Sequence, residues 1–198
     1  MAAPIPLRRR EPPRPTARVQ LLPSSVLGVS IFVLTEIMFF AGFISAFAIM
    51  RGSAVIWPPL DQPRLPAAET AFNSALLFAS GALLFLAGRW HVTRPERARS
   101  LLLGAVGLGA GFVLLQGREW AQLLAQGLTL SSSALGSFFY LIVGMHALHA
   151  VVALGVLVWV WLRMRRGDLS RPTLAAAEIF WYFVVGVWPV LYWRVYLA

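Results

Sequence analysis

The chain has 198 residues, of which 59% are hydrophobic and only 13% are charged. A soluble globular domain carries about 25% charged residues, and here the deficit coincides with apolar runs long enough to cross roughly 30 Å of hydrocarbon. This composition indicates an integral membrane protein and excludes an ordinary soluble domain. Because there is no cysteine, disulfides, thiolate metal sites and iron–sulfur clusters are excluded as well.

The net charge of +9 comes entirely from arginine, since the chain contains no lysine. A basic chain sometimes binds nucleic acid. These arginines, however, lie in tails and in the connectors between apolar runs, not on an amphipathic recognition helix. We therefore expect no nucleic-acid partner.

Residues 1–20 form a polar tail rich in proline and arginine, followed by a membrane domain over residues 21–198. The first apolar run is too long for a signal-peptide core and has no small-residue cleavage motif at its end, so we expect a retained transmembrane helix. Long runs without alternation of period two favour helices over a membrane β-barrel. The prediction is an all-α bundle of five transmembrane helices over residues 25–50, 70–87, 100–125, 137–162 and 176–197.

The connectors differ in composition from the spans. The segment 51–66 contains four prolines, too many for a continuing helix. The segments 90–99 and 163–172 are rich in arginine. The serine run Ser131–Ser133 precedes the fourth span and predicts an N-cap at its start.

Arginine is distributed unequally between the two sides of the predicted bundle. With the N-terminus in the cytoplasm, thirteen arginines fall on the cytoplasmic side and four fall on the other side. The positive-inside rule therefore predicts a cytoplasmic N-terminus and an outside C-terminus, as an odd number of spans requires. Aromatic residues near the span ends are interpreted as interface anchors: Trp57, Trp120, Tyr192, Trp193 and Tyr196 outside, and Trp90, Trp159, Trp161 and Trp181 inside.

Strongly polar side chains inside the spans are rare, and each needs an explanation, because a charge near the bilayer centre costs about 2.5–3.5 kcal/mol on insertion scales. They are Glu36, Gln116, Glu119, His146 and His149. From a helical rise of about 1.5 Å per residue, Glu36 lies roughly 16 Å from the inner face and His149 roughly 18 Å from the outer face. Both are therefore near the midplane, and we expect a hydrogen bond between them if the first and fourth helices touch.

His146 and His149 are three residues apart and share a helix face. The favoured interpretation is that they form hydrogen bonds with Glu36 or with a neighbouring helix. Bis-histidine haem ligation needs imidazoles from opposite sides, which one helix does not provide. A metal site made of these histidines and Glu36 lacks the spacing of a known zinc or di-iron signature. We thus expect no catalytic, cofactor-binding or metal-binding residue in this chain.

Gln116 and Glu119 are also three residues apart, toward the outer end of the third span and next to Trp120. We interpret them first as the polar end of a helix at the membrane interface.

Four segments, one on each of four spans, resemble the motifs of a single family in that family's order. The segments are Thr35–Phe43 (Ser/Thr-Glu-x-x-x-Phe), Leu115–Trp120 (Gln-x-x-Glu-Tyr/Trp), Gly144–His149 (Gly-x-His-x-x-His) and Phe180–Trp188 (Tyr-Trp-His-Phe-Val-Asp-x-x-Trp). Over about residues 20–198 the chain thus resembles subunit III of haem–copper cytochrome c oxidases, in its short five-helix bacterial form. In the last motif Trp181 and Trp188 match, whereas Tyr182 stands where the family has histidine and the aspartate is missing.

The resemblance implies a non-catalytic subunit of a terminal oxidase of aerobic respiration in the bacterial inner membrane. Its partners would be subunit I, in direct contact, subunits II and IV of the same complex, and membrane lipids. Haem and copper would belong to partner subunits, and this chain would bind phospholipid and support proton uptake and stability during turnover. Glu36, His146 and His149 match the family's intramembrane glutamate and histidines, which implies a polar cluster that supports proton uptake.

Two alternatives remain open at this point. The nearest is a subunit III-like accessory protein of a bacterial nitric oxide reductase, which shares these motifs. The other is a stand-alone proton-conducting transporter that uses Glu36, although transporters more often show internal repeats and helices broken at the midplane, which this sequence lacks.

Overall fold

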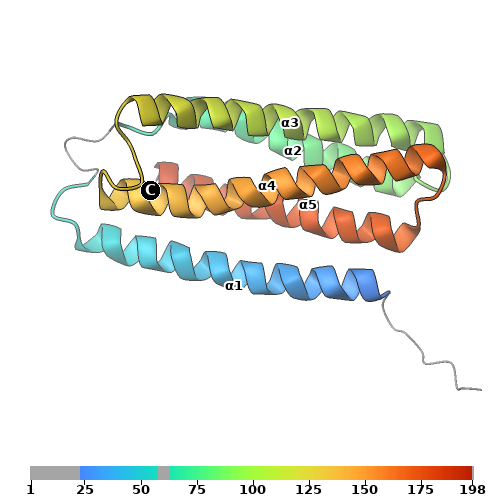
Figure 1. The fold of residues 1–198 in the computed structure, drawn as a ribbon, viewed down its shortest axis with the longest axis horizontal. Coiled ribbons are helices and arrows are strands. Elements are labelled where there is room, and N and C mark those ends of the chain that lie inside the picture. Colours follow the sequence, from blue (N-terminus) through green and yellow to red (C-terminus); the bar gives the residue numbers. More distant parts are fainter. Residues whose placement is uncertain (1–22, 58–62, 198) are drawn as a thin grey trace, which may run out of the picture.

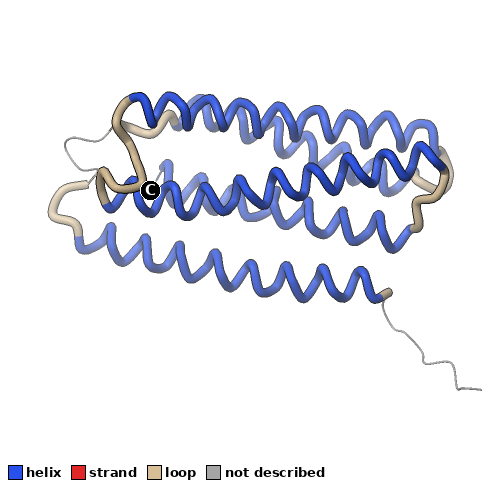
Figure 2. The backbone as a smooth tube through the Cα atoms, in the orientation of Figure 1, coloured by secondary structure: helices blue, strands red, loops and turns tan. Residues whose placement is uncertain are grey.

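The computed structural model describes residues 23–57 and 63–197, and over these residues the chain is helical and has no strand. The helices run side by side in one elongated bundle, with loops only at its two ends (Figures 1 and 2). They are α1 (Ser24–Ser53), α2 (Ala67–Trp90), α3 (Pro95–Ala125), α4 (Ala134–Arg166), α5 (Arg171–Leu191) and a short π-helix, η1 (Tyr192–Leu197). The predicted tail 1–20, Pro58 and Pro59 lie outside the described residues.

Each predicted span lies within the structure's helices, and five helices are long and apolar enough to cross a membrane. The prediction of an all-α five-helix bundle is therefore confirmed. One detail was not predicted: the fifth span changes from α5 into η1 at Tyr192, three residues after Pro189. Proline has no N–H to donate to the helical ladder, so an α-helix is weakened at this position.

The ends of α4 follow from the sequence around them. Ser133 is the N-cap, and its hydroxyl accepts the backbone N–H of Gly136 at 3.1 Å. The predicted cap is thus present. At the other end Gly167 has φ 77°, a left-handed conformation that favours glycine, and the helix stops there. Asp168 follows this glycine and accepts two hydrogen bonds from the Arg163 guanidinium, at 3.0 and 3.1 Å. These bonds hold the pKa of the Asp168 carboxyl below its usual value.

Helices α2–α5 form the core, and α1 lies along one side of it, against α5 and α4 (Figure 1). Of all α1 residues only Phe40 and Phe47 are buried. The outer face of α1 is apolar and exposed, with Leu34 60%, Met38 69% and Ile49 74% accessible. Helix α1 is therefore a peripheral element whose outer face meets lipid or another protein.

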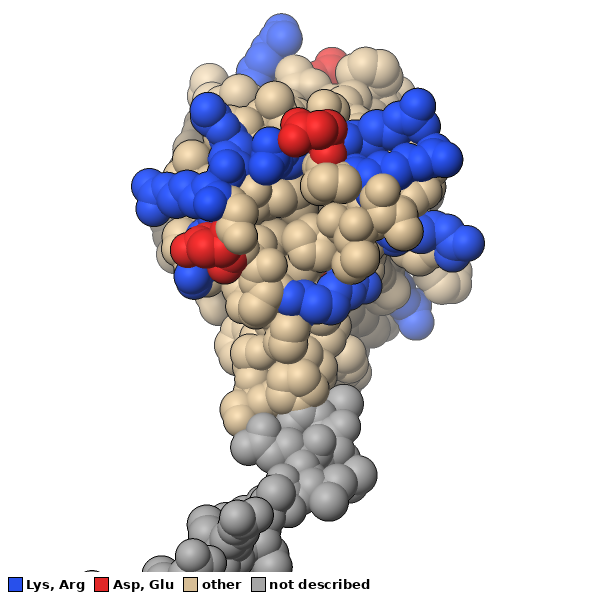
Figure 3. All heavy atoms as spheres, turned by 90° about the vertical axis from the view of Figure 1, so that its right-hand side faces the viewer, with Lys and Arg blue, Asp and Glu red and all other residues tan. Residues whose placement is uncertain are grey.

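Arginine gathers at one end of the bundle, where α1, α3 and α5 begin and α2 and α4 end (Figure 3). We call it the arginine-rich end. Its described arginines are Arg89, Arg94, Arg97, Arg99, Arg163, Arg165, Arg166 and Arg171. The distribution agrees with the positive-inside rule, while the cytoplasmic location of this end stays a prediction.

Most of the expected aromatic anchors lie at the bundle ends, and five tryptophans stack on arginine. The guanidinium carbons lie 4.9–5.8 Å from the ring centroids of Trp57, Trp90, Trp159, Trp161 and Trp193. The interpretation of Trp181 as an anchor was wrong. Its side chain is fully buried in the core, because Gly109 of α3 leaves room for the indole there.

Gly109→Ala tests this close approach. A Cβ at Gly109 would lie 2.8 Å from Trp181 Cη2 and 3.2 Å from Leu154 Cδ1, too close for an unshifted core. We expect the unfolding free energy to fall by about 1–3 kcal/mol, the usual cost of overpacking. The matched control is Gly107→Ala on the same helix, where a Cβ has no neighbour within 4 Å. Equal unfolding free energies for the two variants, measured in the same lipid or detergent, would contradict the packing described here.

Candidate functional site

Two polar groups lie inside the bundle, and the first joins α1 to α4. The Glu36 carboxylate oxygen Oε2 lies 3.2 Å from His149 Nε2. The matched depths of these residues had suggested this contact, and the structure contains it. What the pair does in function stays a prediction.

The hydrogen-bond partners of His149 determine where its protons lie. Its Nδ1 is 2.7 Å from the backbone carbonyl of Met145, and since a carbonyl only accepts, Nδ1 carries a hydrogen. If the ring is neutral, Nε2 has a lone pair and can only accept a hydrogen bond. The Glu36 carboxyl must then be protonated and donate its O–H to Nε2. A charged ring would instead donate Nε2–H to the Glu36 carboxylate. In both forms one proton lies between the two residues and the pair has no net charge.

Aromatic rings surround this pair. The His149 ring centroid lies 5.6 Å from that of Phe40, 5.8 Å from Phe183, 6.3 Å from Phe32 and 6.4 Å from Phe180. These rings exclude competing hydrogen-bond partners and keep the local dielectric constant low, which strengthens the contact. The Glu36 side chain remains 20% exposed, so one side of the pair is reachable from outside the bundle.

His146 does not share in this pair, and among the described residues its ring does not form the expected hydrogen bond to Glu36 or to a neighbouring helix. Its ring is 2% exposed and stacks on Trp188, with centroids 4.9 Å apart and planes 27° apart. Among the described residues, neither ring nitrogen has a hydrogen-bond partner. One helical turn from His149, the ring stacks on Trp188 of α5, and its centroid lies 6.5 Å from those of both Phe112 of α3 and Phe40 of α1.

The second polar group surrounds Glu119, near the C-terminal end of α3. The Glu119 carboxylate accepts hydrogen bonds from Asn73 at 2.5 Å, and from Thr70 and Gln116 at 2.8 Å each. The Gln116 amide also donates to the Tyr196 hydroxyl at 3.2 Å. We call these five residues the Glu119 cluster.

Gln116 and Glu119, interpreted first as the polar end of a helix at the membrane interface, are buried inside the bundle, at 4% and 3% exposure. The reason is that α2 covers them on one side and η1 brings Tyr196 over them on another. Thr70, Asn73 and Ser74 of α2 were missed as site residues. Their spacing, three and four residues apart, was a usable signal, because it puts three polar side chains on one helix face.

The motif positions of the last helix have separate roles. Trp188 stacks on His146 and donates its indole N–H to the Ser74 hydroxyl at 2.7 Å, which ties α5 to α2. Trp181 packs against α3 at Gly109, as described above. Tyr182, which replaces the family's histidine, is half-buried and lines a groove between α1 and α5.

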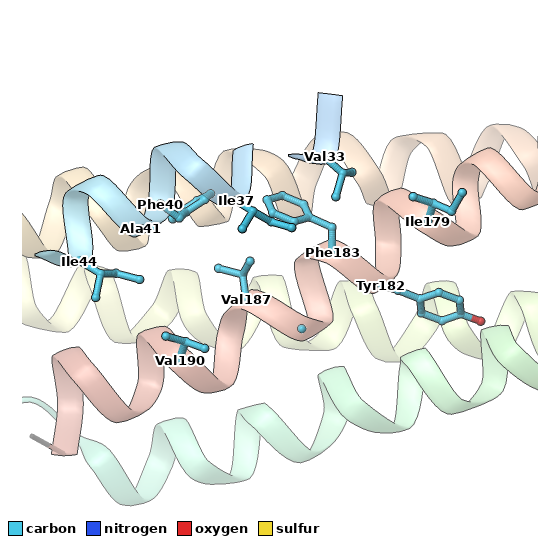
Figure 4. Close-up of a pocket in the computed structure, with 11 residues that line it drawn as sticks. Val33, Ile37, Phe40, Ala41, Ile44, Ile179, Tyr182, Phe183, Val187 and Val190 are labelled. Carbon is cyan, nitrogen blue, oxygen red and sulfur yellow. The ribbon is translucent and has the colours of Figure 1, made fainter. Parts of the chain in front are cut away.

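This groove has a volume of about 510 Å³ and a nearly all-apolar lining (Figure 4). Phe40, Ile37 and Val33 come from α1, and Phe183 and Val187 come from α5. Gly186 also lines it, and a Cβ there would have no neighbour within 4 Å. The groove is thus suited to an apolar chain.

Within residues 23–57 and 63–197, no group of three or more His, Asp or Glu side chains is arranged to hold a metal ion. What the described polar residues offer chemically is proton binding at the Glu36–His149 pair, together with hydrogen bonding in the Glu119 cluster.

Comparison with known proteins gives one consistent family. Residues 19–198 match the family described as "Cytochrome c oxidase subunit III". The chain is 30% identical over 177 residues to cytochrome c oxidase subunit 3 of a Synechocystis species, which covers 87% of this chain and 75% of that protein. It is 33% identical over 201 residues to a probable cytochrome c oxidase subunit 3 of Mycobacterium leprae. That alignment covers 91% of this chain and 93% of the relative. With five membrane-spanning helices and such bacterial relatives, it is a multi-pass protein of the bacterial inner membrane.

A double-mutant cycle on Glu36→Leu and His149→Leu tests whether the two residues stabilise each other. Each single substitution leaves the other polar group without its partner, whereas the double substitution removes both. In such cycles, interhelical hydrogen bonds in membranes contribute about 0.6 kcal/mol on average and up to about 1.7 kcal/mol, so we expect a coupling free energy in this range. Reversible unfolding in mixed micelles measures it. Additive effects would mean that the contact contributes nothing to stability.

Proposed function

Because the chain belongs to the cytochrome c oxidase subunit III family, we propose that it is the non-catalytic subunit III of a cytochrome c oxidase. In that complex it packs on subunit I and assembles with subunits II and IV, and haem and copper belong to those partners. The observation that carries the proposal is the match over residues 19–198, which includes all four motif segments.

The Glu36–His149 pair supports a role in proton uptake. One proton lies between the two side chains, and either residue can hold it without a change in the net charge of the pair, so the proton moves from one residue to the other at low electrostatic cost. Glu36 keeps 20% of its side chain exposed, which leaves a route for exchange with a neighbouring subunit. The surrounding phenylalanines keep the pair apart from bulk solvent.

The groove between α1 and α5 supports lipid binding. Its lining is apolar over about 510 Å³, and it runs beside the exposed face of α1, where acyl chains are the surrounding solvent. An acyl chain in this groove buries apolar surface on both helices and fills the gap that Gly186 leaves. Lipid bound there strengthens the attachment of α1, the helix with the fewest buried residues.

The proton-uptake role predicts that substitution of Glu36 impairs proton uptake while the complex still assembles with its haem. In the assembled complex, Glu36→Ala is expected to leave haem content intact but to slow proton uptake or to shorten the active lifetime during turnover. Glu36→Gln keeps a hydrogen-bond donor toward His149 but has no transferable proton, so we expect the same defect with smaller loss of stability. Glu96→Ala is the control, because Glu96 is exposed and bonded only to Arg99. Loss of the haem absorption bands would contradict the accessory role.

The lipid-binding role predicts that filling the groove removes lipid. Gly186→Leu places a side chain in the groove without a backbone clash, and fewer phospholipids should then copurify with the complex. Gly155→Leu is the matched control, because this α4 position is equally open and lies outside the groove. Phosphorus analysis of the purified complexes gives the number of phospholipids bound per complex. The same lipid content in both variants would refute the assignment of this groove, although not the oxidase membership.

A further inference from the structure

A second cavity lies between α3 and α4, away from the Glu36–His149 pair. Its volume is about 160 Å³, and most of its lining is apolar, including Phe112, Val143 and Trp188. Three polar residues also line it: Gln116, Trp120 and His146. The functional proposal above assigns no role to this cavity.

Each of the three polar residues has a buried atom without a hydrogen-bond partner among the described residues. These atoms are Gln116 Oε1, Trp120 Nε1 and both ring nitrogens of His146. The Gln116 amide nitrogen is engaged by Glu119 and Tyr196, which fixes its carbonyl oxygen as the free end. Buried polar atoms are normally hydrogen-bonded, and several orphans around one cavity point to a missing partner.

The chemistry of these atoms identifies the partner. The indole N–H of Trp120 only donates and Oε1 of Gln116 only accepts, while a neutral His146 ring offers one donor and one acceptor. An anion would satisfy only the donors and a cation only the acceptors. Water both donates and accepts, and a molecule of water takes roughly 30 Å³ in the liquid, so the cavity of about 160 Å³ holds several.

We propose that this cavity is an internal water site, in which a few water molecules are bound by Gln116, Trp120 and His146. The bound water joins the Glu119 cluster, through Gln116, to His146. His146 is one helical turn from His149 and thus from the pair with Glu36. The hydrogen-bonded Glu119 cluster then extends to His146, one turn of α4 away from the Glu36–His149 pair. The proposal concerns this chain alone and does not rest on the oxidase assignment.

Solid-state NMR on the full chain in lipid vesicles tests the proposal directly. With ¹⁵N-labelled histidine only three residues are observed, and magnetisation is transferred to their ring nitrogens from water. We expect His146 to receive it rapidly although its side chain is 2% exposed. Gly117→Leu places a side chain against the cavity without a clash and should slow the transfer to His146 several-fold. Gly107→Leu, on the same helix but outside the lining, should leave it unchanged.

Slow transfer to His146 in the unmodified chain, equal to that in Gly117→Leu, would overturn the proposal. If Gly117→Leu fails to fold, Ala147→Leu fills the same cavity from α4. A second measurement uses His146→Phe, which keeps an aromatic ring on Trp188 but removes both nitrogens. If water is bound to His146, this substitution removes its hydrogen bonds to the ring, and the melting temperature should fall. A higher melting temperature would mean that the nitrogens were simply unsatisfied, and would also overturn the proposal.

Discussion

Hydrocarbon supplies no hydrogen-bond partners, so every polar side chain within these five helices depends on finding a partner inside the protein. The bundle meets this constraint in two ways. Glu36 and His149 pair with each other, which joins α1 to α4 near the middle of both helices. Glu119 instead accepts hydrogen bonds from neutral donors on α2 and α3, and its cluster holds those two helices and η1 together. These two polar groups therefore connect α1 to α4 and connect α2, α3 and η1 to one another.

The remaining packing is apolar and unequal. Helices α2–α5 bury large rings, such as Trp181 against Gly109 and Trp188 against His146, and they form a core of their own. Helix α1 adds only Phe40 and Phe47 to this core and borders an open groove along α5. A subunit of this kind presents one well-packed side and one side whose partners are lipid or protein, which is the form expected of an accessory member of a membrane complex.

Much of this structure was predictable from the sequence. The spans follow from hydrophobic length, the α4 cap follows from Ser133, and the Glu36–His149 contact follows from equal depth, because depth depends only on residue number along a straight helix. The failures concern rotation about the helix axis. Whether His146 points toward α1 or α5, and whether Trp181 faces the interface or the core, depends on how neighbouring helices are turned. The Glu119 cluster was missed for the same reason, since two of the three donors to Glu119 belong to α2.

The peripheral position of α1 has a consequence for biosynthesis. Helix α1 is made first, but the histidine that Glu36 contacts lies on the fourth helix, after two further spans have entered the membrane. Until then Glu36 has no partner from this chain, and its protonated form is the cheaper one to hold in lipid. The helices that α1 packs against, α5 and α4, both follow it in the chain, so α1 has no packing partner of its own chain until those spans have been made.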